Sequence, residues 1–507
     1  MKNALTLLSL VARTDSYKFS QFLQYPKGTE YISSYIESRG GEDESVFFGI
    51  QAFIMDYLLT PVTMKDVDRA EKIITAHGLP FNRAGWEIVV NKFGGLMPIE
   101  IQAVPEGTVM GTKNVQVQIV NTDPRMAWVT SYIETILLRG VWYPSTVATK
   151  SRKLKKVIAQ YLHETSDVPV MDQLPFKLHD FGARGASSGE TAILGGMGHL
   201  VNFMGTDTFE AIEGVMAYYN TDEVVGYSIP ASEHSTITSW GRENEAKAFE
   251  NIIDNFAGEG KIYACVSDSF DIYAACEDIW GEQLKDKVIN SGGTLVVRPD
   301  SGNPVTTPVN VIEILANKFG TEVNSKGYKV LPSYIRVIQG DGINEKSLVE
   351  ILELMRTRGF STENIAFGMG GGLLQAWDRD TLRYAMKASA IKIDGGNWEG
   401  FAKDPITDKG KKSKEGRLGL IEQCGIGSCG YVTVTEDTAN EKGNVLRTIF
   451  KNGKLLVEDN FQDIRKRAEI SERDYQTPVK RPIFPDHKTR EYAESVAKAW
   501  AANAKNT

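Results

Sequence analysis

Short apolar runs recur through the middle of this chain about 25 to 40 residues apart, with helical patterns between them. The runs are FKLHDF, HLVNFMG, VVGYSIP, IYACVSD, TLVVRPD, YIRVIQGDG, IAFGMGGG and AIKIDGG. Such alternation predicts parallel strands joined by crossover helices. Because there are so many runs, an irregular (β/α) barrel is favoured over a small open sheet, and the expected fold class is α/β.

The two ends of the chain have a different pattern. Residues 30–38 and 99–119 are typical of strands, and residues 51–59 and 128–138 are typical of helices. From about Phe401 the chain becomes basic and then strand-rich again. We therefore expect a smaller flanking α+β domain built from residues 1–160 and 401–507, and a barrel-like domain over residues 161–400.

The overall composition argues against two classes of partner. The net charge of −8 and the pI of about 5.5 disfavour a surface that coats nucleic acid. No apolar run approaches the ~20 residues of a membrane span, and we interpret the apolar start MKNALTLLSLVAR as a packed segment rather than a signal peptide. With only four cysteines in the chain we expect a cytoplasmic protein, in which Cys424 and Cys429 are free thiols rather than zinc ligands.

Residues 177–191, KLHDFGARGASSGET, predict a strand that runs into a polar turn and opens a helix. A flat ring can stack on Phe181 while Arg184 meets a carbonyl or an anion. The glycine loop at residues 368–372 lacks the dinucleotide and Walker patterns. It predicts either a phosphate-binding turn or a tight turn in close packing. Together these features indicate a flat, phosphorylated substrate.

Charged residues follow several of the other predicted strands. Arg298 and Asp300 flank a proline and form either a structural salt bridge or part of a site. Asp341, between two glycines, can present a carboxylate to Mg²⁺ or a ribose hydroxyl. In the run Ser267–Asp271, one oxygen is expected to cap the helix that follows. His234 follows a carboxylate and is, from its local sequence alone, more typical of a structural hydrogen-bonding histidine than of a catalyst.

Eight motifs occur together and in order, and in combination they are highly specific. They are TDSYK (14–18), HDFGARGASS (179–188), GTDT (205–208), PASEHST (230–236), VSDSFD (266–271), RPDSGNP (298–304), VIQGDG (337–342) and GGGLLQ (370–375). From about residue 13 to the late 480s the chain resembles the nicotinamide phosphoribosyltransferase family. The resemblance implies a type II phosphoribosyltransferase fold and a homodimer with shared active sites. It also implies NAD biosynthesis by a reaction of nicotinamide with phosphoribosyl pyrophosphate, assisted by Mg²⁺.

The resemblance also implies roles for single residues. The pyridine ring lies between Phe181 and Tyr17 of the other subunit, and Asp207 accepts the carboxamide N–H. Arg184 and Arg298 lie near the ring, the carboxamide and the phosphates. The remaining implied residues bind ribose, phosphates or metal: Asp271 and Asp300 at ribose and metal, Asp341 at metal and phosphate, and Asp15, Arg39, Ser267, Gly340, Gly370, Gly371, Arg379, Lys387, Lys403 and Lys411 at phosphates.

His234 resembles the family histidine that ATP phosphorylates, which reverses the structural interpretation. The implied catalytic set is His234, Asp271, Arg298 and Asp300, and no side chain acts as a nucleophile toward the sugar. Met369 and Ala385 depart from the family pattern, which bears on phosphate binding and regulation.

Three alternatives remain open from the sequence. The first is the sister activity on nicotinate, against which Asp207 argues because a carboxylate repels a carboxylate. The second is a non-catalytic binding protein on the same scaffold. The third is an aldolase-like barrel, for which Lys392 is the one candidate Schiff-base lysine.

Overall fold

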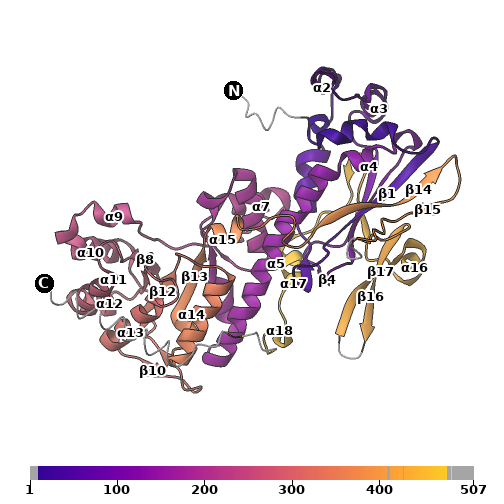
Figure 1. Cartoon of the computed structure of the whole chain (residues 1–507). Coiled ribbons are helices and arrows are strands. Elements are labelled where there is room, and N and C mark those ends of the chain that lie inside the picture. Colours follow the sequence, from indigo (N-terminus) through magenta and orange to yellow (C-terminus); the bar gives the residue numbers. More distant parts are fainter. Residues whose placement is uncertain (1–8, 408–411, 426–427, 477–480, 482–507) are drawn as a thin grey trace. The chain divides into compact units, whose positions relative to one another are not determined.

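The computed structural model describes residues 9–407, 412–425, 428–476 and 481. The chain divides into two compact units (Figure 1). The first unit comprises Met1–Lys155, Leu178–Ser228 and Met369–Ile470, and the second comprises Lys156–Lys177, Ile229–Gly368 and Ser471–Thr507. The predicted Lys411 phosphate contact and the helix pattern at residues 488–502 lie outside the described residues.

The first unit is built around a seven-stranded antiparallel sheet in the order β15-β14-β1-β5-β3-β18-β19. Its strands come from both halves of the chain, so the orange strand β14 lies beside the indigo strand β1 in Figure 1. Alternating apolar residues place side chains such as Ile36, Ile101 and Ile119 in one large core. The strands are β1 (Thr29–Glu37), β3 (Ile99–Ala103), β5 (Val115–Asn121), β14 (Ala385–Ile393), β15 (Glu399–Gly400), β18 (Arg447–Lys451) and β19 (Lys454–Leu455).

Two predicted parallel strands are wrong. The run HLVNFMG begins with His199 and Leu200 at the end of a helix, and only its last residue, Gly205, belongs to a strand. The run AIKIDGG belongs to β14, which pairs antiparallel with β1, for example Ile391 with Ile32. Lys392 therefore lies on the antiparallel sheet, with its ammonium 5.8 Å from the centre of the Tyr31 ring. The aldolase-like alternative loses its lysine at a barrel strand end.

Several helices of the first unit follow the predicted pattern. The pattern at 51–59 forms α1 (Ile50–Phe53) and a π-helical turn, Ile54–Leu58. The pattern at 128–138 forms α4 (Val129–Tyr132) and the start of α5 (Glu134–Thr165), whose 32 residues continue beyond this unit. The other helices are α2 (Met64–Ala76), α3 (Arg83–Phe93), α7 (Gly189–Leu200), α8 (Phe209–Tyr218), α15 (Gly371–Leu374), α16 (Glu436–Lys442) and α17 (Phe461–Ala468).

A second sheet has six strands in the order β7-β6-β13-β12-β9-β8. The pairs β8–β9, β9–β12, β12–β13 and β6–β7 are all parallel. Isolated parallel bridges also join Gly205 to Tyr227 and Ala231 to Ala264, in the predicted VVGYSIP run and just after it. The strands are β6 (Leu178–Asp180), β7 (Gly205–Thr206), β8 (Ile262–Val266), β9 (Thr294–Arg298), β12 (Ile335–Gln339) and β13 (Ile365–Met369).

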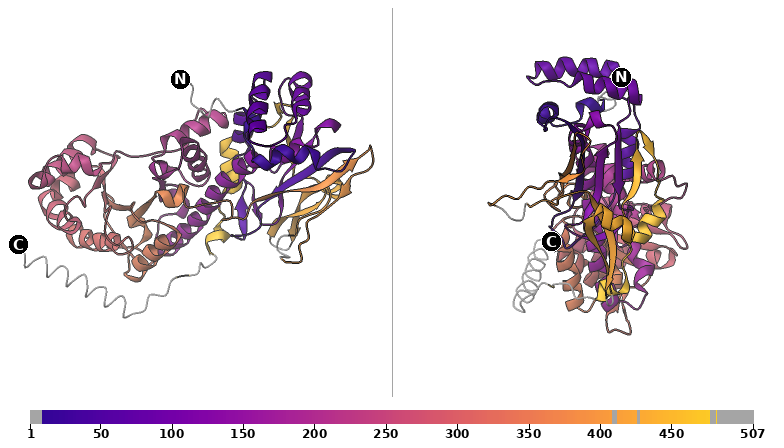
Figure 2. Two further views of the ribbon diagram at one scale, coloured as in Figure 1. Left: turned by 45° about the horizontal axis from the view of Figure 1, so that its top comes forward. Right: turned by 90° about the vertical axis from the view of Figure 1, so that its right-hand side faces the viewer.

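Crossover helices connect the parallel strands of the second unit and lie outside them (Figure 2). They include α10 (Glu245–Phe256), α12 (Lys285–Asn290), α13 (Thr307–Phe319) and α14 (Glu345–Thr357). A shorter helix, α9 (His234–Thr238), precedes α10. The predicted α/β class, with an irregular barrel-like parallel sheet, is confirmed.

The expectation that Cys424 and Cys429 are free thiols is wrong. Strands β16 (Leu418–Gly425) and β17 (Ser428–Thr435) form a hairpin whose register places Cys424 opposite Cys429. The two residues form a disulfide, while Cys265 and Cys276 are free and buried.

The part of the apolar start that the structure describes packs into the core. Leu10 and Val11 are buried in the core of the first unit, and residues 1–8 lie outside the described residues. Among the described helices none is long and apolar enough to cross a membrane.

Candidate functional site

His234 begins α9 in the second unit and contacts two carboxylates. Its Nε2 lies 2.9 Å from Asp268 Oδ1, and its Nδ1 lies 4.0 Å from Asp300 Oδ2. The Asp268 side chain is 3% exposed and the histidine ring 46% exposed. A buried carboxylate thus orients a ring that remains open to solvent.

Asp300 is held by Arg298 in a two-pronged ion pair. Arg298 Nε and Nη2 donate to the two carboxylate oxygens at 3.1 and 2.6 Å. Arg298 ends β9 and the proline between the two residues stiffens the turn, so the pair projects from a firm frame. The predicted pair and His234 therefore lie together at the ends of strands in the second unit.

Two residues of the SDSFD run form hydrogen bonds within the protein. Asp271 Oδ1 accepts the N–H groups of Tyr273 and Ala274, so this is the helix-capping oxygen that was expected. Ser267 is fully buried, and its hydroxyl accepts the indole N–H of Trp280 at 3.0 Å. Its predicted contact with phosphate remains a prediction.

Glu245 is a buried carboxyl in this neighbourhood that the sequence did not reveal. It begins α10, is 8% exposed, and its Oε1 has no hydrogen-bond partner among the described residues. Its pKa is raised to about 7, chiefly by burial and also by the charges of Asp271 and Asp268, against the opposing effect of Arg242. An acidic residue in a first helical turn is ordinary, so no sequence signal marks it.

The loop after β12 carries Gly340 and Asp341, as predicted. Asp341 is exposed, and its backbone carbonyl accepts the side-chain amide of Gln339 at 2.8 Å. Gly342 has a φ of +66°, which favours glycine in this turn.

In the first unit, Phe181 and Asp207 follow two neighbouring parallel strands. Asp180 ends β6 opposite Thr206 of β7, so the next residue on each strand is Phe181 or Asp207. Phe181 is half-buried and Asp207 is exposed. The hydroxyl of Ser228 donates to Asp207 Oδ1. Ser228 was missed because it lies inside the apolar VVGYSIP run.

The glycine loop packs against the turn that carries Phe181 and Arg184. The Phe181 N–H donates to the Met369 carbonyl at 3.0 Å. A Cβ on Gly182 would lie 2.9 Å from the Gly370 carbonyl, and one on Gly185 would lie 3.2 Å from Gly371 Cα. Arg184 is exposed beside this contact. The structure therefore brings together the two motifs that the sequence indicated for ring and phosphate.

Four other predicted residues line a separate cavity of about 390 Å³ in the first unit. They are Asp15, Tyr17, Arg379 and Lys387, and Ala385 lines the same cavity. Tyr17 is 59% exposed, and Asp15 Oδ2 accepts the hydroxyl of Thr135. These residues are the ones that the resemblance assigns to the neighbouring subunit or the phosphates.

Positive charges crowd the same region. Burial lowers the pKa of Lys387 against the opposing charge of Glu134, and the charges of Arg39, Lys403 and Lys18 lower it further. Arg39 is paired with Glu37, whose other oxygen accepts from Lys414. Lys403 is exposed. Positive charges that lower the pKa of a neighbouring lysine favour a bound anion.

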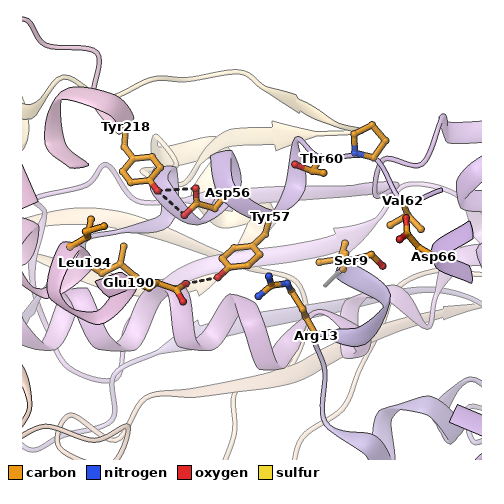
Figure 3. Close-up of a pocket in the computed structure, with 13 residues that line it drawn as sticks. Ser9, Arg13, Asp56, Tyr57, Thr60, Val62, Asp66, Glu190, Leu194 and Tyr218 are labelled. Atoms are coloured by element: carbon orange, nitrogen blue, oxygen red, sulfur yellow. Dashed lines mark hydrogen bonds between the residues drawn. The ribbon is translucent and has the colours of Figure 1, made fainter. Parts of the chain in front are cut away.

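A larger cavity, of about 550 Å³, lies elsewhere in the first unit (Figure 3). The Tyr57 hydroxyl donates to Glu190, and the Tyr218 hydroxyl donates to both Asp56 oxygens at 2.8 and 2.9 Å. The Arg13 guanidinium lies 4.9 Å from the centre of the Tyr57 ring. None of these residues was a predicted site residue, and their polar groups are largely satisfied by one another.

Known proteins that resemble this chain belong to the same kind of enzyme along most of its length. Residues 176–454 match the "Nicotinate phosphoribosyltransferase (NAPRTase) family", and residues 9–101 match "Nicotinamide phosphoribosyltransferase, N-terminal domain". A nicotinamide phosphoribosyltransferase of Xanthomonas campestris pv. campestris is 50% identical over 466 residues, which covers 91% of this chain and 98% of that protein. A nicotinamide phosphoribosyltransferase of Acinetobacter baylyi is 31% identical over 490 residues, which covers 89% of this chain and 95% of that protein.

Solved structures share the fold at low identity. Nicotinate-nucleotide pyrophosphorylase from Pyrococcus furiosus matches with a TM-score of 0.59 at 16% identity, over 94% of this chain and 99% of that one. Human nicotinic acid phosphoribosyltransferase matches with a TM-score of 0.54 at 15% identity, over 96% of this chain and 99% of that one. This likeness confirms the fold that the eight motifs implied.

Proposed function

Because this chain belongs to the nicotinamide phosphoribosyltransferase family, enzymes of the glycosyltransferase type that serve NAD biosynthesis, we propose that it joins nicotinamide to phosphoribosyl pyrophosphate. The products are nicotinamide mononucleotide and pyrophosphate. The observation that carries this choice of substrate is the exposed Asp207 carboxylate at the strand end next to Phe181. Phe181 offers a ring face for stacking, and Asp207 accepts the carboxamide N–H.

The charge on Asp207 favours the amide over the acid. A carboxylate is a hydrogen-bond acceptor only, so it pairs with an amide N–H and repels the carboxylate of nicotinate. Ser228 donates to one Asp207 oxygen and leaves the other for the substrate. The sister activity on nicotinate is the second candidate, and the family match over residues 176–454 keeps it as the rival to be tested.

The proposed reaction depends on electrostatic stabilisation of a leaving group. Breaking the bond between the ribosyl C1 and the pyrophosphate oxygen leaves positive charge on the sugar and negative charge on pyrophosphate. The basic set around Lys387 and Arg379 stabilises that negative charge, and the pyridine nitrogen attacks from the opposite face of the sugar. No side chain has to act as a nucleophile toward the sugar.

Asp300 and Asp341 supply oxygen donors of the kind that Mg²⁺ takes. Mg²⁺ is usually held by one or two carboxylates together with substrate phosphates, so two carboxylates at strand ends of the second unit fit it. When bound, the ion neutralises charge on the pyrophosphate. Arg298 meanwhile holds Asp300 in place through its paired hydrogen bonds.

We further propose that His234 is phosphorylated by ATP. With the ring proton on Nε2, the Nε2–H donates a hydrogen bond to Asp268, and the lone pair on Nδ1 is left as the nucleophile. Nδ1 attacks the γ-phosphorus of ATP, the bond to the β,γ-bridging oxygen breaks, and ADP leaves. The phosphoryl group then adds negative charge next to Asp300 and Arg298, which changes how pyrophosphate is held.

A homodimer with shared active sites completes the proposal. Tyr17, Asp15 and Arg379 line their own cavity, and Phe181 and Asp207 lie at the ends of β6 and β7. Exposure of the Tyr17 ring supports a role on the substrate of a second copy. The cytoplasmic location expected from the sequence stays a prediction.

The direct test is formation of both products by the purified chain. Nicotinamide, phosphoribosyl pyrophosphate and Mg²⁺ are incubated with enzyme, and mononucleotide and pyrophosphate are quantified together. Equal molar amounts of the two products support the proposed reaction. Binding of both substrates without product supports the non-catalytic alternative instead.

A further inference from the structure

Asp180 is a buried residue that connects Phe181 and Asp207, the proposed stacking ring and amide acceptor for nicotinamide. It is the last residue of β6, is fully buried, and directly precedes Phe181. Its backbone carbonyl accepts the N–H of Asp207 at 2.9 Å. A single residue of the parallel sheet thus sets the positions of the stacking ring and the amide acceptor.

The side chain of Asp180 adds a second constraint. Its Oδ1 accepts the Gly182 N–H at 2.7 Å, which closes a tight turn around Phe181. The Phe181 N–H is bonded to the Met369 carbonyl on the other side. Since Gly182 also packs against Leu374 and the Gly370 carbonyl, the turn has little room to move. This hydrogen bond therefore helps to hold the backbone that carries the Phe181 ring.

The cost of this arrangement argues that it serves a purpose. Among the described residues none forms a hydrogen bond of normal geometry with the buried Oδ2, which faces Gly196 of α7. The pKa of Asp180 is raised to about 6, chiefly by burial and also by the charge of Asp207, against the opposing effect of the Gly182 N–H and the Thr208 hydroxyl. An apolar residue of the same shape would avoid this cost, but it would leave the Gly182 N–H without its acceptor.

We propose that Asp180 is a positioning residue for nicotinamide, which holds the Phe181 turn through its side-chain oxygen and Asp207 through its backbone. It touches no reacting atom and acts through these two residues. The inference rests on the proposed function, because it assigns the site to nicotinamide.

The test compares two variants of similar shape, Asp180→Asn and Asp180→Leu. Both remove the charge, but only asparagine keeps an oxygen that can accept the Gly182 N–H. We expect Asp180→Leu to raise the KM for nicotinamide about tenfold, with the KM for phosphoribosyl pyrophosphate within about twofold of wild type. Asp180→Asn should stay within about threefold of wild type for both substrates.

The outcomes separate this inference from the proposed function. A merely structural role would lower the active fraction, and hence kcat, without moving one KM alone. A nicotinamide KM within twofold in Asp180→Leu, or an equal rise in both variants, would overturn the inference. Wild-type enzyme that makes no mononucleotide would overturn the proposed function instead. If Asp180→Leu does not fold, Asp180→Ala takes its place, because it also lacks the acceptor and fits any space that aspartate fills.

Discussion

His234 Nε2 lies 2.9 Å from Asp268 Oδ1, and the carboxylate is almost fully buried while the ring is open to solvent. The buried partner fixes the direction of the ring, and the exposure lets a phosphoryl donor approach. This relationship gives the proposed ATP step its first test.

His234→Ala is expected to abolish stimulation by ATP while slow basal synthesis continues, because no nitrogen remains to take the phosphoryl group. Asp268→Asn should reduce the stimulation without abolishing it, since the ring is kept but oriented less firmly. The measurement is the rate of mononucleotide formation with and without ATP. His163→Ala, on an exposed residue of α5, is the matched control. Equal ATP stimulation in His234→Ala would remove the phosphohistidine role.

Asp207→Ser is expected to weaken nicotinamide use and to relax the discrimination against nicotinate. A lost charge-assisted hydrogen bond corresponds to about a 10- to 100-fold fall in kcat/KM for the amide. Steady-state kinetics on both substrates check it, with the exposed Asp222→Ser as control. If the preference is unchanged, selectivity lies elsewhere in the site.

Tyr17→Ala and Phe181→Ala should complement each other if active sites are shared. A dimer with one copy of each variant has one site in which both rings are mutated and one in which both are intact. Heterodimers purified through two different tags should therefore show about half of wild-type activity. Each homodimeric variant should be strongly impaired. Heterodimers no more active than the variants alone would show that the two rings serve the same subunit's site.

The buried Glu245 predicts a pH dependence of stability. Its folded-state pKa of about 7 is above the ordinary 4.5, so the folded state holds the proton more tightly. The stability from this group is fully present below pH 4.5 and is lost as the pH rises through about 7. Glu245→Gln should flatten this part of the profile by about 2 kcal/mol in the free energy of unfolding. Denaturant unfolding at several pH values checks it, and parallel profiles for both proteins would contradict it.

The Cys424–Cys429 disulfide is expected to hide both exposed thiols from alkylation. Cys265 and Cys276 are buried, and burial raises the pKa of the Cys265 thiol to about 12, so the native protein should take up no iodoacetamide. After mild reduction by a dithiol, intact-mass measurement should show two adducts. Two adducts without reduction would mean free thiols, as the sequence alone suggests.

The parallel strands were predictable because buried strands read as short apolar runs bounded by polar turns. The same signal misled at β14, because an apolar run does not reveal which strand it pairs with. Ile391 pairs with Ile32, which is distant in sequence, and the packing of the core determines this long-range pairing. The cysteine pair was missed for a similar reason, since only the hairpin register places the two residues opposite each other.

The candidate site was partly predictable from motifs. The role of Asp271 as a helix cap followed from its place before a helix. The turn that contains Gly182 packs closely against the glycine loop, which agrees with the glycines in both motifs. Ser228 and Glu245 carried no signal, because one lies in an apolar run and the other looks like an ordinary helix-opening acid. Their roles come from neighbours distant in sequence, which no local pattern records.

The measurement that tests the central claim most directly is a competition in one vessel. Wild-type enzyme receives phosphoribosyl pyrophosphate, Mg²⁺ and equal concentrations of nicotinamide and nicotinate, and the two mononucleotides are separated and quantified. The proposed role of Asp207 predicts that nicotinamide mononucleotide predominates by at least about tenfold. A predominance of nicotinate mononucleotide would contradict the account and assign the chain to the sister activity.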